Sequence, residues 1–169
     1  MIPRDPLAAC AALAGRRGRV LLHSGRDDDG RGRWSFVAAD PVATIEAHGH
    51  HVIERDRAGR IVREVDGDPL DELEAFAARH GADLRDGDGD RAAPGDDGGA
   101  AAPEPRVIGL LGYELGASVL AGLGRTAGGA PTTRADDATP DLWMAAYGAV
   151  ARWRGGGDAG YGAAEIVGP

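Results

Sequence analysis

The chain has 169 residues, 43% of them hydrophobic and 27% charged, which is within the range of one globular domain with a modest core. Its formal net charge of -8 argues against nucleic-acid binding, because affinity for a phosphate backbone needs clustered cations that release counterions. All 19 basic residues are Arg, so lysine-adduct chemistry within this chain is excluded.

The single cysteine, Cys10, permits no internal disulfide, and this predicts a reducing compartment. The sequence shows no basic-then-apolar leader and no apolar stretch long enough to span a membrane. We therefore expect neither secretion nor membrane insertion, and a cytoplasmic location.

The first elements expected in chain order are a short helix around residues 7–13 and a strand at residues 19–24. Large and small side chains then alternate at residues 33–39 and 42–47, with an Asp-Pro break between the two runs. This pattern predicts two further strands across a tight turn.

The next segment predicts a hairpin followed by a helix. Residues 50–56 and 60–65 read as two strands around an Ala-Gly turn. Apolar side chains then recur on one helical face of residues 69–81, with Pro at the start and Gly at the end. Antiparallel strands followed by a helix indicate an α+β fold, with antiparallel sheets in a sandwich-like arrangement and a few packed helices.

The second half of the chain alternates polar loops with strands. Residues 82–105 contain almost no large apolar side chain, so we expect a mobile insertion there, and residues 125–139 predict a second flexible loop. Strands are expected at residues 106–113, 142–154 and 162–167. Because these strands need partners, we expect the halves on either side of the insertion to share one core, and residues 1–169 to form one domain.

The sequence offers only weak candidates for catalytic or metal-binding residues. The three histidines within residues 48–51 (HGHH) do not all share one face of a strand, and no ligand-spaced Cys or carboxylate stands beside them, so we expect no metal site. Ser24, Ser35 and Ser118 lie in no nucleophile elbow. No catalytic residue is expected in this chain.

Four segments resemble a known family: residues 20–25 (VLLHSG), 32–41 (GRWSFVAADP), 109–116 (GLLGYELG) and 140–153 (PDLWMAAYGAVARW). In this order they are similar to the amino-terminal domain of component I of anthranilate synthase and aminodeoxychorismate synthase. The aminodeoxychorismate branch, which makes the precursor of 4-aminobenzoate for folate, is the slightly closer match. The resemblance implies that this chain is incomplete relative to full-length members.

The resemblance implies partners for this chain. Complete members have a larger carboxy-terminal domain, absent here, that binds chorismate and Mg²⁺, and they receive ammonia from a glutamine amidotransferase subunit. The resemblance also implies that Tyr113 and Glu114 lie near the interface with that catalytic domain. The expected role is therefore a non-catalytic domain that supports the chorismate-binding domain.

The resemblance further implies a candidate tryptophan pocket, since the family's amino-terminal domain commonly holds this amino acid. Leu22, His23 and Ser24 match its Leu-Leu-acid-Ser element, with His23 in the place of the acid. A mostly neutral imidazole balances a ligand ammonium less well than a carboxylate does. Two alternatives stay open from the sequence: a stand-alone amino-acid-binding module and a truncated relic without function.

Overall fold

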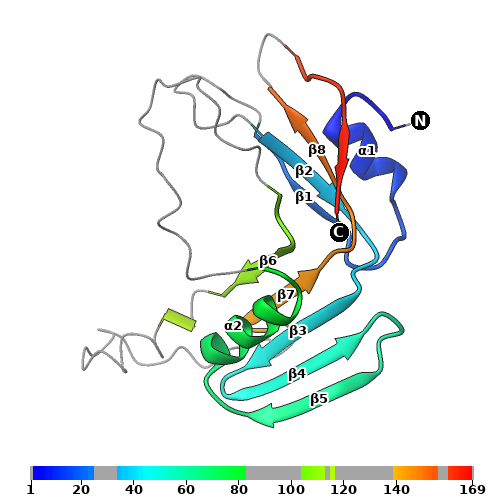
Figure 1. Ribbon diagram of the computed structural model, residues 1–169. Coiled ribbons are helices and arrows are strands. Elements are labelled where there is room, and N and C mark those ends of the chain that lie inside the picture. The colour runs from blue at the N-terminus through cyan, green and yellow to red at the C-terminus, as the bar shows by residue number, and fades with distance from the viewer. Residues whose placement is uncertain are drawn as a thin grey trace.

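The computed structural model describes residues 2–24, 34–82, 104–112, 115–116, 139–155 and 160–168. Within these ranges, nine strands form two antiparallel sheets, and each sheet is covered by one helix (Figure 1). The predicted α+β class with antiparallel, sandwich-like sheets is confirmed. Neither described helix is long and apolar enough to cross a membrane.

One sheet has four strands in the order β1-β2-β8-β9. Their bounds are Val20–Leu22 (β1), Trp34–Ala38 (β2), Val150–Arg154 (β8) and Glu165–Val167 (β9). The first and last parts of the chain meet here, since β2 pairs with β8 over its length. The amino-terminal and carboxy-terminal segments are therefore held together by the central ladder of this sheet.

Helix α1 (Pro6–Ala12) covers one face of the four-stranded sheet. It begins after Asp5, whose carboxylate accepts hydrogen bonds from backbone N–H groups of the first turn. The helix packs against a cluster that includes Val37 and the fully buried Trp153. The Trp153 indole N–H donates to the carbonyl of Pro3 at 3.2 Å, which ties the amino-terminal segment to β8.

The other sheet has five strands in the order β5-β4-β3-β7-β6. Their bounds are Ile61–Asp66 (β5), His51–Asp56 (β4), Ala43–His48 (β3), Leu142–Ala146 (β7) and Val107–Leu111 (β6). Strand β7 pairs with β3, and β6 pairs with β7, so strands from both sides of the predicted insertion build one sheet. Residues 83–103 of that insertion, and 125–138 of the second predicted loop, lie outside the described residues.

Helix α2 (Pro69–Arg79) covers the five-stranded sheet and agrees closely with the predicted helix. Asp68 caps its amino terminus, and Gly81 follows it with a φ of 72°, a left-handed value that favours glycine. Its Phe76 is fully buried against the sheet. The helix is thus anchored by the apolar face that the sequence pattern predicts.

A buried carboxylate adds a polar link between α2 and the sheet. Glu54 of β4 is only 6% exposed, and its Oε1 lies 2.5 Å from Arg79 of α2 and 3.5 Å from Arg63 of β5. Arg63 also forms a two-point ion pair with Glu72, and this hydrogen bonding raises the pKa of the Arg63 guanidinium. The network joins β4, β5 and α2 and leaves the buried carboxylate paired.

The two sheets are joined by two continuous segments. Strand β2 runs into β3 across Asp40 and Pro41, and β7 runs into β8 across residues 147–149. The sequence predicted a single strand at residues 142–154, but the structure breaks it where the chain passes from one sheet to the other. Strands β2 and β3, predicted across a tight turn, likewise lie in different sheets.

A shared core lies where the sheets meet. Its buried members come from both sheets and from the β7–β8 connection: Ala38, Ile108, Ala145, Tyr147 and Val150. Side chains alternate between faces along each strand, so the same strands that meet here face a helix on their other side. Among the described residues, α1 packs on one sheet and α2 on the other, and the two sheets meet through the side chains of this shared core.

Candidate functional site

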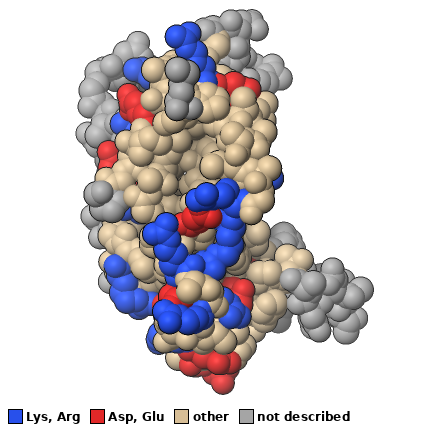
Figure 2. Space-filling model, turned by 90° about the vertical axis from the view of Figure 1, so that its right-hand side faces the viewer, with Lys and Arg blue, Asp and Glu red and all other residues tan. Residues whose placement is uncertain are grey.

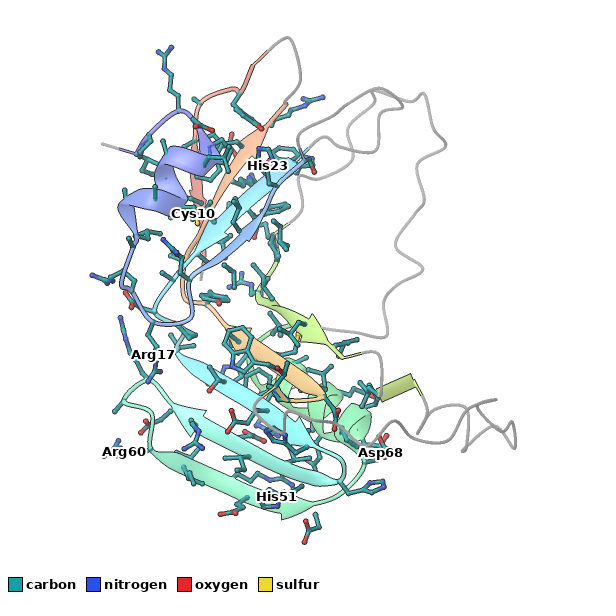
Figure 3. All side chains as sticks on the ribbon, turned by 180° about the vertical axis from the view of Figure 1, so that it is seen from behind. Cys10, Arg17, His23, His51, Arg60 and Asp68 are labelled. Atoms are coloured by element: carbon teal, nitrogen blue, oxygen red, sulfur yellow. The ribbon has the colours of Figure 1, made fainter. Side chains whose placement is uncertain are left out.

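The residues predicted to hold a ligand lie at the end of β1, in the four-stranded sheet. Leu22 is the last residue of β1, and its side chain is 45% exposed. The His23 Nε2 lies 2.6 Å from the hydroxyl of Tyr161, and the backbone N–H of Ser24 donates to Ser35 Oγ at 3.1 Å. Figure 3 shows His23 near the end of the sheet that lies away from the five-stranded sheet.

This group includes two residues that sequence reasoning did not assign to a ligand site. Ser35 was considered only as a nucleophile, yet it is fully buried and its hydroxyl holds the chain directly after β1. Tyr161 carries no local signal, because the antiparallel bridge between Gly155 and Tyr161 brings it to His23 from 138 positions away. Tryptophan binding at Leu22–Ser24 stays a prediction.

Of the histidines at residues 48–51, His51 contacts two carboxylates that the sequence did not place. In the β4–β5 ladder, His51 Nε2 lies 3.2 Å from Glu64, and its Nδ1 lies 3.4 Å from Asp66. Both carboxylates come from the neighbouring strand, so the spacing within β4 gave no hint of them. Among the described residues, no group of three or more His, Cys, Asp or Glu side chains is arranged to hold a metal ion.

The predicted interface residues Tyr113 and Glu114 lie outside the described residues, but the strand before them is described. Among the described strands, β6 is the last on its side of the five-stranded sheet, and Leu110 and Leu111 are 46% and 53% exposed. A Cβ added at Gly109 would stand 2.0 Å from the carbonyl oxygen of Trp143. Glycine therefore permits close pairing of this edge strand, next to an exposed apolar surface.

Tyr147 links the junction of the two sheets to the loop before β1. Its side chain is buried, and its hydroxyl donates to the carbonyl oxygen of Gly18 at 2.6 Å. Burial raises the pKa of the Tyr147 phenol to about 12 from its ordinary value of 10.0. The neutral phenol is therefore the form that the folded chain favours.

Removing this hydroxyl has a testable pH signature. Between pH 10 and about 12, the unfolded chain loses the Tyr147 proton while the folded chain keeps it, so stability should fall as the pH rises. Tyr147→Phe should make this fall shallower, and at neutral pH should cost about 1 kcal/mol from the lost hydrogen bond. Urea unfolding at stepped pH measures both effects. An unchanged slope in Tyr147→Phe would contradict this role.

Comparisons with known proteins give no family assignment. A scan against protein-family models found no match, and a search of curated proteins found none either. The resemblance to component I enzymes rests on the four sequence segments described above.

Proposed function

We propose that this chain is the non-catalytic amino-terminal domain of a component I chorismate-aminating synthase. The support is the pairing of the four family-like segments, residues 20–25, 32–41, 109–116 and 140–153. Strand β2 of the second segment lies between β1 of the first and β8 of the fourth, and β6 of the third pairs with β7 of the fourth. Residues as distant in sequence as Ser35 and Trp153 thus pair on adjacent strands, as expected if the motifs belong to one structural unit.

The proposed task is to support a separate chorismate-binding domain. Chorismate and Mg²⁺ would bind in that domain, a glutamine amidotransferase subunit would supply the ammonia, and the proposed location is cytoplasmic. The 4-aminobenzoate pathway is preferred over the tryptophan pathway because of the form of residues 109–116 and 140–153. In this proposal, Tyr113 and Glu114 lie close to the docking surface.

The described edge strand next to those residues suits a docking surface. An uncovered edge with exposed apolar side chains is normally shielded by charge, a bulge or another element. Leu110 and Leu111 expose apolar surface on β6, and no charged residue interrupts the strand. A partner domain that packs on β6 would cover this surface.

The alternative of a stand-alone amino-acid-binding module is weaker. Its ligand ammonium would need a negative or strongly accepting group at the family's acid position, which is His23 here. The Nε2 of His23 is already engaged with the Tyr161 hydroxyl. This contact weakens the case for ammonium recognition at this position.

The docking proposal is tested by binding to a separately expressed chorismate-binding domain of a component I enzyme, measured by titration calorimetry. We expect a one-to-one complex, and we expect Leu110→Asp to weaken it about tenfold or more, because a charge would be buried at the interface. Val62→Asp is the matched control, since Val62 is 62% exposed on the opposite edge strand β5. Absence of a complex, or equal weakening by the two variants, would contradict docking through β6.

A further inference from the structure

An open hollow of about 260 Å³ lies where the two sheets meet, outside the predicted ligand strand. It is lined by Arg16, Arg17, Asp40, Pro41 and Arg57. These residues come from the loop before β1, the β2–β3 connection and the β4–β5 turn. Figure 2 shows basic side chains gathered around an acidic one on this face, and Figure 3 places Arg17 between the sheets.

The hollow carries an excess of positive charge in a chain that is acidic as a whole. Its lining has three guanidinium groups and one carboxylate, which leaves two positive charges. Asp40 is ion-paired with Arg16, and the hydrogen bond from Arg16 lowers the pKa of the Asp40 carboxyl. Asp40 is therefore charged at neutral pH and offsets one arginine, while Arg17 and Arg57 provide the excess.

The backbone beneath these side chains is tightly constrained. Asp40 has a φ of 51°, a left-handed value uncommon outside glycine, and its N–H donates to the carbonyl of Arg17 at 2.8 Å. Gly18 also has a positive φ of 57°, and a Cβ there would stand 2.8 Å from the ring of Pro41. Tyr147 holds the Gly18 carbonyl from the other side.

The two arginines that supply the excess differ in how they are held. Arg17 Nη2 donates to the carbonyl oxygen of Asp56 at 3.2 Å, which orients its guanidinium and leaves its other N–H groups available. Arg57 occupies the β4–β5 turn and makes no hydrogen bond or ion pair with any described residue, although it acts electrostatically on Asp40. Arg57 thus lines the hollow without an ionic partner among the described residues.

We propose that this hollow binds a small dianion that bears a phosphoryl group, with Arg17 and Arg57 as the principal donors. Guanidinium groups match phosphate geometry with paired N–H donors, and a dianion balances the two excess charges. A hollow of about 260 Å³ is below the roughly 300–1,000 Å³ of drug-sized pockets, so it suits a small ligand. This site does not depend on the proposed docking function.

The test is titration calorimetry of the whole chain with inorganic phosphate at about pH 8 and constant ionic strength, with malonate as a dicarboxylate comparison. We expect saturable one-to-one phosphate binding, weakened about tenfold by Arg57→Gln, because a hydrogen bond between charged groups is lost. Arg154→Gln is the matched control: it removes the same charge from an exposed position on β8 and should leave the dissociation constant nearly unchanged.

A second variant should act in the opposite direction. Asp40→Asn removes the negative charge, frees Arg16, and keeps a residue type that tolerates a left-handed backbone, so phosphate should bind several-fold more tightly. Weakening by Arg57→Gln together with tightening by Asp40→Asn would support the site. Non-saturable heat, equal loss in the Arg57 and Arg154 variants, or binding of malonate but not phosphate would overturn it.

Discussion

Trp153→Ala should lower the free energy of unfolding by about 3–5 kcal/mol, the range expected when a buried aromatic side chain is truncated in a core. Trp153 has no exposed surface, and it packs with Val37 of β2 and Ala9 of α1. The substitution would leave a cavity between sheet and helix and would also remove the hydrogen bond to the Pro3 carbonyl. Urea unfolding followed by circular dichroism measures the loss.

Trp153→Phe separates the two contributions. It keeps most of the apolar ring but removes the indole N–H, so we expect a smaller loss of about 1–2 kcal/mol. If Trp153→Ala cost no more than Trp153→Phe, the tryptophan would not fill the core between α1 and the four-stranded sheet. The layered arrangement of that part of the fold would then be wrong.

Phe76→Ala should destabilise the chain by a similar amount, about 3–5 kcal/mol, because it empties the core beneath α2. Phe76 is fully buried in a cluster that contains Ile45 of β3, Val52 of β4 and Leu142 of β7. Leu142 follows the predicted insertion, whereas the others precede it. The lost contacts therefore join both halves of the sequence, and the whole sheet should lose stability together in one cooperative transition.

The control for Phe76→Ala is Leu7→Ala, which truncates an apolar side chain that is 53% exposed on α1. Such a surface change should alter the free energy of unfolding by no more than about 0.5 kcal/mol. Two separate unfolding transitions in Phe76→Ala, with only one of them shifted, would contradict a core shared between the halves.

Elements with strong local signals were predictable from the sequence. Helix α2 has a 3.6-residue apolar period, with Pro69 at its start and Gly81 after its end, and the structure places it within two residues of the predicted range. The β4–β5 hairpin follows from alternation around an Ala-Gly turn, where Gly59 has a φ of 83°. In both cases a few neighbouring residues determine the local backbone.

The sheet assignments were not predictable in the same way. Alternation continues through residues 142–154, so the pattern does not reveal that the chain leaves one sheet and enters the other near Tyr147. Asp40 and Pro41 read as a turn between paired strands, but β2 pairs with β1 and β8 while β3 pairs with β4 and β7. These partners depend on contacts between distant segments, which a local pattern does not encode.

The candidate sites likewise combine residues that a local motif can identify with contacts that depend on the fold. Leu22, His23 and Ser24 were selected from a motif, but the contact of His23 with Tyr161 depends on the isolated bridge to Gly155. The hollow brings together Arg16 and Arg57, which lie 41 positions apart and which no local sequence pattern connects. Sequence spacing identifies candidate residue types, and the sheet topology decides which of them meet.

The central claim, that this chain supports a chorismate-aminating domain, is tested most directly by ammonia-dependent chorismate turnover. A separately expressed chorismate-binding domain of a component I enzyme is assayed with increasing amounts of this chain. We predict that turnover rises and saturates at one chain per domain, and that Leu110→Asp requires a higher concentration to produce the same rise. Unchanged turnover with both proteins folded would contradict the proposed function.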